Sequence, residues 1–197
     1  MIYLLRHGKI QAGPKKRFIG QTDCGLSAAG RLQAESWRAF FKTINLPLIL
    51  CSDLKRSLET AGIIAGRQAD TVYVETRLRE IHLGEWEDRE MAKIRAEHPN
   101  EWEKRGQDLA GFRPPKGESF ADLDKRVAPV LAELGAAEQD NLLIVGHAGV
   151  NRVLICRILG MPLQNLFRLG QDYGCLNIIY KKETHYQIQG LNMCTST

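Results

Sequence analysis

The chain has 197 residues, of which 44% are hydrophobic and 25% are charged, and these proportions are typical of a soluble globular domain. Its formal charge of +4 is too small to indicate nucleic-acid binding, although it suits an anionic small molecule. No stretch approaches the roughly 20 apolar residues of a membrane span, the N-terminal apolar run is too short for a signal peptide, and the five cysteines form no C-x-x-C pair. We therefore expect a single cytoplasmic domain over residues 1–197, with no membrane or nucleic-acid partner and no zinc or disulfide framework.

The first predicted element is a strand over Ile2–Leu5, an unbroken apolar run typical of parallel sheets that are buried on both faces. It leads directly into Arg6, His7 and Gly8. Since ligands of parallel sheets bind beyond the strand ends, Arg6 and His7 are expected at the mouth of a crevice. A guanidinium fork beside a nucleophilic imidazole is suited to holding and attacking a phosphate.

The following segment, residues 9–23, is predicted to be irregular and contains the basic cluster Lys15-Lys16-Arg17. We interpret this cluster as a solvated loop, with a rim that attracts an anionic substrate as the alternative. Ser27 can then cap a helix whose inward positions are predicted to be Ala29, Leu32, Ser36, Ala39 and Phe40.

A second strand is predicted at Leu48–Cys51, and a helix with Arg56 in its first turn follows it. A cation at a helix N-terminus opposes the helix macrodipole. Arg56 is therefore either an ordinary surface residue or part of an anion site that it shares with the exposed amides. The inward face of this helix is predicted to consist of Leu54, Leu58, Ala61 and Ala65.

A short strand at residues 72–74 precedes an acidic segment over residues 78–87. A carboxyl group held among apolar neighbours can act as a general acid, because burial favours its protonated form. The residues themselves leave Glu80, Glu85 and Glu87 open for this role, although Glu85 and Glu87 are more typical of solvent-facing positions.

Two helices are predicted next, one over residues 91–104 and one from Ser119 onward, with a long loop at 106–117 between them as a candidate lid. The second helix contains Pro129, which is expected to kink or break it. Its apolar face is predicted to consist of Leu123, Val127, Val130, Leu131 and Leu134.

A further buried strand, Leu142–Val145, ends in Gly146-His147-Ala148-Gly149 and leads into a helix. His147 thus has the same position relative to its strand as His7, which favours one shared site over two unrelated structural histidines. Residues 175–180 and 185–189 are predicted as late strands that form a hairpin around Lys181-Lys182.

If the strand ends converge, one pocket contains Arg6, Arg56, His7, His147 and a nearby carboxyl group. Phosphoryl transfer needs neutralised phosphate oxygens, an in-line nucleophile and a protonated leaving group. The arginines can neutralise the oxygens, one histidine can attack, and the carboxylic acid can protonate the departing alkoxide. Such a site requires no metal and no other cofactor.

Six segments with recognisable motifs occur in order along the chain: Leu5–Gly8, Gly20–Gly30, Ser52–Ala61, Glu80–Glu87, Gly117–Ser119 and Val145–Val150. This ordered set resembles the motifs of the histidine phosphatase, or phosphoglycerate mutase-like, superfamily. The resemblance covers nearly the whole chain, and it implies a three-layer α/β/α sandwich with a mainly parallel sheet.

The resemblance also implies roles for individual residues. His7 matches the nucleophile of a phosphohistidine mechanism, Glu80 matches the proton donor, and Arg6, Arg56 and His147 match the phosphate pocket. Further positions are implied to contact the substrate or its phosphate: Gln21, Thr22 and Ala148.

The chain departs from the family pattern at several positions outside this set. Lys9-Ile10 stand where many relatives carry Glu-Thr or Glu-Ser, Ser57 replaces a common alanine, and Asp88 replaces a common glycine. The predicted reaction class is unaffected, whereas the transfer of a substrate by analogy is weakened.

Within the superfamily, the compact chain and its Gly-Glu-Ser at 117–119 favour the phosphatases over the mutases. Residues 19–23, 147–149 and 171–174 resemble α-ribazole phosphatases, which act in cobalamin nucleotide-loop assembly, with broad-specificity or sugar phosphatases as the alternative. The expected partner is a phosphorylated small molecule, and the chain is expected to be a monomer or homodimer. Two other classes are a phosphate-binding protein without turnover and a metallohydrolase built on His7, His82 and His147.

Overall fold

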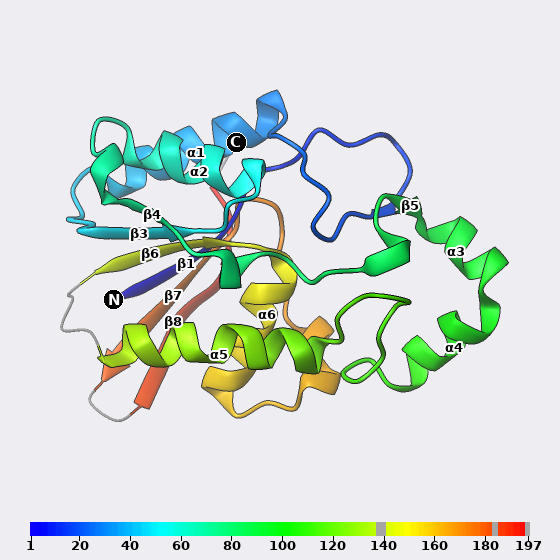
Figure 1. Cartoon of the computed structure of the whole chain (residues 1–197). Coiled ribbons are helices and arrows are strands. Elements are labelled where there is room, and N and C mark those ends of the chain that lie inside the picture. The colour runs from blue at the N-terminus through cyan, green and yellow to red at the C-terminus, as the bar shows by residue number, and fades with distance from the viewer. Residues whose placement is uncertain (137–140, 183–184, 196–197) are drawn as a thin grey trace.

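The computed structural model describes residues 1–136, 141–182 and 185–195. Its centre is a six-stranded sheet in the order β4-β3-β6-β1-β7-β8 (Figure 1). Strands β1, β3, β4 and β6 are parallel, whereas β7 runs antiparallel to both β1 and β8. The strand bounds are β1 Ile2–Arg6, β3 Leu48–Cys51, β4 Val72–Val74, β6 Leu142–Gly146, β7 Leu176–Lys182 and β8 His185–Met193.

The predicted three-layer α/β architecture with a mainly parallel sheet is thereby confirmed. The late strands are also confirmed, although Lys181 and Lys182 extend β7 itself. The connection at residues 183–184 lies outside the described residues.

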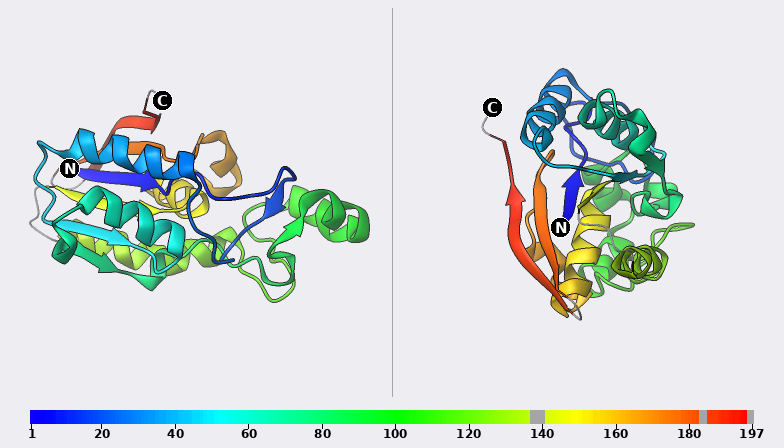
Figure 2. Two further views of the ribbon diagram at one scale, coloured as in Figure 1. Left: turned by 90° about the horizontal axis from the view of Figure 1, so that it is seen from above. Right: turned by 90° about the vertical axis from the view of Figure 1, so that its left-hand side faces the viewer.

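Helices cover both faces of the sheet (Figures 1 and 2). Helices α1 (Ala28–Phe41) and α2 (Lys55–Ala65) lie on one face, and α5 (Phe120–Ala136) and α6 (Ala148–Leu159) lie on the other. Because successive side chains of a strand point to opposite faces, β1 contributes to two cores. Tyr3 and Leu5 pack in the core with α1 and α2, while Ile2 and Leu4 pack in the core with α5 and α6. This two-sided burial is the physical reason for the unbroken apolar runs.

Helix α1 begins as predicted, with the Ser27 hydroxyl accepting a hydrogen bond from the Gly30 amide at 3.1 Å. Its predicted inward face is wrong, because Leu32 is 66% exposed and Phe40 is 42% exposed. The buried residues are instead Gly30, Ala34, Trp37 and Phe41. The Trp37 indole fixes this rotation, since its N–H donates to the Gly174 carbonyl at 2.6 Å.

The predicted face of α2 is wrong in part. Leu54 and Ala61 are buried, but Leu58 is 36% exposed. The helix approaches the sheet through small side chains, and the Ser57 hydroxyl donates to the Val145 carbonyl of β6 at 2.7 Å. Polar residues therefore occupy positions that a purely apolar pattern assigns to solvent.

Gly30 allows α1 to lie directly against the segment that follows β1. A Cβ atom at Gly30 would overlap the Lys9 carbonyl oxygen and lie 2.9 Å from the Lys9 carbonyl carbon. We expect Gly30→Ala to lower the free energy of unfolding by about 1–3 kcal/mol, as overpacking of a rigid backbone contact does. Gly62→Ala in α2 is the matched control, because a Cβ atom there meets open space. It should raise stability by about 0.5–1 kcal/mol. Equal shifts in urea denaturation would contradict the prediction.

Two prolines act differently from one another. The predicted helix over 91–104 is divided at His98 into α3 (Met91–Glu97) and α4 (Pro99–Gln107), because the residue before a proline disfavours helical geometry. Pro129 does not break α5, contrary to one of the predicted outcomes. The buried side chains of Val127 and Val130 hold the helix against the core on both sides of this proline.

A small extension projects beyond the carboxyl ends of the parallel strands (Figures 1 and 2). It contains α3, α4 and a two-stranded ribbon of β2 (Arg17–Phe18) and β5 (Arg89–Glu90). Its own core has Phe18, Trp86 and Ile94 at its centre. We call residues 9–23 and 81–107 together the extension.

The loop at 106–117 is attached to the segment that carries the candidate acid. The Glu85 amide donates to the Pro115 carbonyl at 2.9 Å, and the Glu118 amide donates to the His82 carbonyl at 2.7 Å. Short 3-10 turns at Ala69–Thr71, Thr76–Leu78, Gly84–Trp86 and Leu163–Arg168 complete the architecture. Within the described ranges, no helix has the length and apolar character needed to cross a bilayer.

Candidate active site

The register of β1 and β6 brings the two strand-end histidines together. Arg6 is opposite Gly146 in the parallel ladder, and the His7 amide donates to the Gly146 carbonyl at 3.1 Å. The imidazole rings of His7 and His147 consequently have centroids 5.0 Å apart. The predicted convergence of the strand ends is correct.

The hydrogen bond at Nδ1 of His7 sets which nitrogen is nucleophilic. Nδ1 lies 2.8 Å from the Gly8 carbonyl oxygen, and a carbonyl can only accept, so Nδ1 carries the proton. Nε2 of the neutral ring then keeps its lone pair, and His7 lines a cavity. Burial, together with the positive charges of Arg6 and Arg56, lowers the pKa of His7 well below its ordinary value.

Both nitrogens of His147 already have partners. Arg56 donates from Nε to Nδ1 of His147 at 3.3 Å, so Nε2 carries the proton and donates to the Ser52 hydroxyl at 2.7 Å. The side chain is fully buried at the N-terminus of α6. Burial and the neighbouring positive charges also lower the pKa of His147. The structure thus distinguishes two histidines that are equivalent in the sequence pattern.

Arg56 is a buried residue, which excludes the surface alternative. Only 1% of the residue is exposed. Its two terminal nitrogens donate to the carbonyls of Thr22 and Gly20, each at 2.7 Å. A buried guanidinium needs such partners to offset its desolvation. Arg56 therefore fixes the loop at residues 20–22 and orients His147, and it also lines the cavity.

Arg6 is held by the segment that precedes β7. Its Nη1 donates to the Gln171 carbonyl at 2.6 Å, and its guanidinium carbon lies 3.7 Å from the centroid of the Tyr173 ring. Among the described residues, the buried Nε of Arg6 has no hydrogen-bond acceptor. Arg6 is thus fixed in place by Gln171 and Tyr173, while its Nε–H group has no acceptor among the described residues.

Tyr173 and Gln171 are site residues that sequence reasoning missed. Tyr173 lines the cavity, and its ring centroid is 5.6 Å from that of His7. In the sequence, residues 171–174 are linked to the site only through the family resemblance. The pairing of β7 with β1 brings residues 171–174 to the cavity, since this segment precedes β7 and the Gly174 amide donates to the His7 carbonyl at 3.0 Å.

Glu80 is the carboxylate of the acidic segment that lines the cavity beside His7. Its two oxygens accept hydrogen bonds from the amides of Ile81 at 2.9 Å and Gly149 at 3.1 Å. The Gly149 amide belongs to the first turn of α6, which suits a negative charge. Each carboxylate oxygen still has a lone pair for a further partner.

Glu85 and Glu87 have other surroundings. Glu85 is exposed, as predicted, and forms an ion pair with Lys116 at 2.8 Å. The prediction that Glu87 faces solvent is wrong, because its Oε1 accepts from the amides of Gln21 at 2.8 Å and Leu83 at 3.1 Å. Glu87 thus links the loop at residues 20–22 to the segment at residues 81–83, and both segments contribute to the cavity lining.

The remaining predicted positions, Gln21, Thr22 and Ala148, are bonded to or adjoin the residues described above. Gln21 donates from Nε2 to the Glu80 carbonyl at 2.9 Å, and Thr22 accepts from Arg56. Ala148 begins α6, next to His147. None of these three is among the described residues that line the cavity. Their contact with a substrate stays a prediction.

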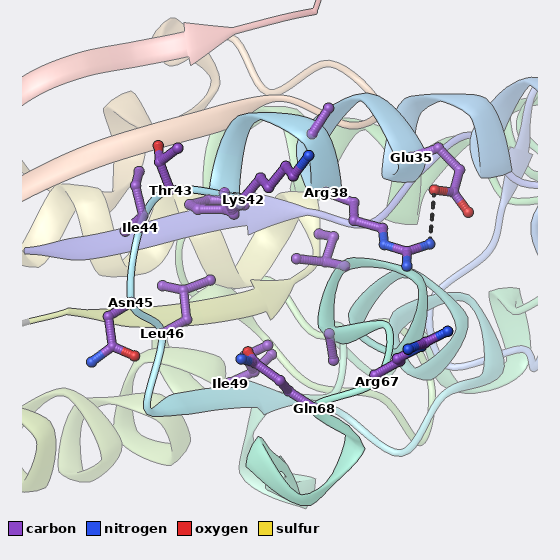
Figure 3. A pocket seen from close by; sticks show the side chains of 14 residues that line it. Glu35, Arg38, Lys42, Thr43, Ile44, Asn45, Leu46, Ile49, Arg67 and Gln68 are labelled. Atoms are coloured by element: carbon purple, nitrogen blue, oxygen red, sulfur yellow. Dashed lines mark hydrogen bonds and ion pairs between the residues drawn. The ribbon is translucent and has the colours of Figure 1, made fainter.

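The cavity has a volume of about 270 Å³ and lies at the carboxyl ends of the parallel strands. Its lining includes five polar side chains that we call the catalytic floor: Arg6, His7, Arg56, Glu80 and Tyr173. A larger cleft of about 750 Å³ lies between the C-terminal ends of α1 and α2 (Figure 3). The lining of this cleft includes the Glu35–Arg38 ion pair but no histidine or cysteine. We therefore assign the chemistry to the smaller cavity.

The ligand set of the metallohydrolase alternative is not assembled in the described part of the chain. No group of three or more His, Cys, Asp or Glu side chains there could hold a metal ion. The ring of His82 faces Glu87, with Nε2 3.9 Å from Oε1.

Comparisons with known proteins identify the family of the chain. A sequence profile of the histidine phosphatase superfamily (branch 1) matches residues 2–193. The adenosylcobalamin/alpha-ribazole phosphatase of Escherichia coli K12 is 29% identical over 97% of this chain and 95% of its own length. The glucosyl-3-phosphoglycerate phosphatase of Mycolicibacterium vanbaalenii is 34% identical over 86% of this chain and 78% of its own length. The crystal structure of the alpha-ribazole phosphatase from Shigella flexneri matches with a TM-score of 0.90 and 29% identity, covering 98% of this chain and 96% of that one.

Proposed function

Because this chain belongs to branch 1 of the histidine phosphatase superfamily and is a phosphatase, we propose that it hydrolyses phosphomonoesters through a phosphohistidine on His7, without a metal ion. The observation that carries this proposal is the Nδ1–Gly8 hydrogen bond. It leaves Nε2 of His7 unprotonated in a cavity shared with Arg6, Arg56 and Glu80.

The reaction has two displacements at phosphorus. Nε2 of His7 attacks the phosphorus atom, the ester P–O bond breaks, and Glu80 transfers a proton to the departing alkoxide. Glu80 then takes a proton from water as the water oxygen attacks the phosphohistidine, which releases inorganic phosphate and restores both residues. Arg6 and Arg56 stabilise the charge on the transferring oxygens in both steps. His147 keeps Arg56 in position through Nδ1, and a direct contact with phosphate stays a prediction.

Arg126 of α5 supports this assignment of Glu80. Its guanidinium donates to the carbonyls of Arg77, Arg79 and Glu80, at 2.6, 2.9 and 3.2 Å. It also pairs with Glu118, whose carboxylate accepts from the His82 amide at 2.9 Å. The backbone on both sides of Glu80 is therefore fixed to a core helix, as a positioned acid requires.

The substrate proposed first is α-ribazole 5′-phosphate, in cobalamin biosynthesis, because relatives named for this activity match nearly the whole chain. Glucosyl-3-phosphoglycerate is the second candidate, since a relative named for its hydrolysis is 34% identical. A panel of these two esters with simple sugar phosphates distinguishes the candidates from a broad-specificity phosphatase by kcat/KM.

The experiment that tests the reaction is rapid-quench labelling with a radioactive phosphomonoester in the presence of a chelator. We expect an acid-labile phosphoenzyme that forms and decays at rates consistent with turnover. Loss of activity on chelation would favour a metallohydrolase, and binding without turnover would favour a phosphate-binding protein.

The lowered pKa of His7 predicts the acid side of the pH profile. Because Nε2 stays unprotonated until the pH falls through this lowered pKa, kcat/KM should hold to pH values below 6.5, the ordinary histidine value, and fall only there. The second pKa of a phosphate ester is also near 6, so two esters of different phosphate pKa should be compared. An acid limb at or above pH 6.5 that is the same for both esters would contradict the prediction.

A further inference from the structure

The part of the cavity lining that the extension supplies is mostly apolar, and we call it the upper wall. Its apolar members are Ile10, Phe18, Ile19, Ile81, Leu83 and Met91. Among the described residues, Arg17 is the charged member of the upper wall. Whether an alcohol with an anionic group can bind against this upper wall therefore depends on whether Arg17 is available to form an ion pair with it.

Arg17 is engaged by two carboxylates of the extension. Its Nε donates to Oδ1 of Asp88 at 2.8 Å, and its Nη2 donates to the carbonyl of Asp88. Its Nη1 is 3.8 Å from Glu90, which also pairs with Lys15 at 3.2 Å. Two cations and two anions thus balance one another, and each nitrogen of the Arg17 guanidinium faces a protein acceptor.

Asp88 holds Arg17 from an unusual backbone conformation. Its φ is +53°, in the left-handed region that favours glycine and that aspartate tolerates better than most residues. The Asp88 amide donates to the Phe18 carbonyl at 2.7 Å, which attaches the turn that precedes β5 to strand β2. Glycine would suit this backbone at least as well, so the turn does not require the carboxylate. What the Asp88 side chain adds is the ion pair with Arg17.

We propose that Asp88 is a specificity-determining residue, because it keeps Arg17 from the substrate and leaves the upper wall an apolar subsite whose one described cation is already paired. The enzyme then prefers phosphomonoesters of uncharged aromatic or apolar alcohols over esters whose alcohol carries a carboxylate. A carboxylate in this subsite would lose water without gaining a cationic partner, which is unfavourable. This inference rests on the proposed phosphatase function.

The test uses two esters that differ only in that charge, benzyl phosphate and 4-carboxybenzyl phosphate. The measured quantity is the ratio of kcat/KM for the carboxylated ester to kcat/KM for the neutral one. We expect this ratio to be well below one for the native enzyme. In Asp88→Gly it should rise about tenfold, which corresponds to about 1.4 kcal/mol of differential transition-state binding. The double variant Arg17→Met with Asp88→Gly should lose this gain, because the released cation is then absent.

Asp88→Asn is the matched control, since asparagine also tolerates the left-handed region but has no charge. It should raise the ratio less than Asp88→Gly does, because its amide oxygen still accepts from Arg17. Glu90→Gln gives an independent variant that should change the ratio in the same direction, whatever the stability of the Asp88 variants. An unchanged ratio in both Asp88→Gly and Glu90→Gln, or a native ratio near one, would overturn the specificity inference while turnover persists. Absence of turnover and of phosphoenzyme would instead overturn the proposed function.

Discussion

Replacing His7 with alanine should abolish turnover, with kcat/KM reduced by about 10³-fold or more, because the proposed phosphohistidine forms on Nε2 of this residue. His147 is the only other histidine beside the floor in the described residues, and its nitrogens are bound to Ser52 and Arg56. An enzyme that lacks His7 would therefore retain the arginine clamp but have no nucleophile. It should bind inorganic phosphate and release no product.

The measurement combines steady-state kinetics with phosphoenzyme labelling. His185→Ala is the matched control, because this histidine is exposed at the start of β8 and should leave kcat/KM unchanged. His7→Gln preserves more of the buried volume and guards against a folding defect, which thermal unfolding of each variant would reveal. Full activity in either His7 variant would rule out the proposed nucleophile. Label on His147 in the native enzyme would do the same.

Glu80→Gln is the second substitution expected to have a large effect, and its size should depend on the leaving group. General acid catalysis contributes about 10²–10⁴-fold, so kcat/KM with alkyl phosphates should fall by this factor. The loss in kcat/KM should be much smaller with nitrophenyl phosphate, because nitrophenolate departs without a proton. A comparison of kcat/KM across phenyl phosphates of graded leaving-group pKa measures this difference directly, because kcat/KM excludes the later hydrolysis of the phosphoenzyme, in which Glu80 also acts. Equal losses with all esters would argue against protonation by Glu80.

Gly149→Ala offers a control that moves the carboxylate without changing its chemistry. A Cβ atom at Gly149 would overlap Oε1 of Glu80 and lie 3.3 Å from its carboxyl carbon. Displacement of the acid should reproduce the dependence on the leaving group seen in Glu80→Gln, at smaller amplitude. If Gly149→Ala slows all esters alike, the contact matters for folding or phosphate binding rather than for the position of Glu80.

The helix faces show where local patterns mislead. In α1 the exposed Leu32 and Phe40 have the apolar character expected of a core, yet Trp37 determines the rotation because its indole reaches Gly174. In α2 the buried Arg56 and Ser57 are polar residues that satisfy loop and strand carbonyls. A periodicity argument counts hydrophobicity only, so it cannot anticipate side chains that are buried through hydrogen bonds.

The sequence by itself determined the buried strands and the Arg6-His7 and His147 positions at their ends, and it hence predicted a phosphate-handling site there. These features are local, since an unbroken apolar run followed by chemically active residues can be read within one segment. Only the tertiary structure decided which nitrogen of His7 is free, which glutamate lines the cavity, and that Tyr173 and Arg17 belong to it. These properties depend on hydrogen bonds and ion pairs between segments far apart in the chain. The physical reason is that burial and protonation depend on neighbours, and the folded chain selects those neighbours through strand register.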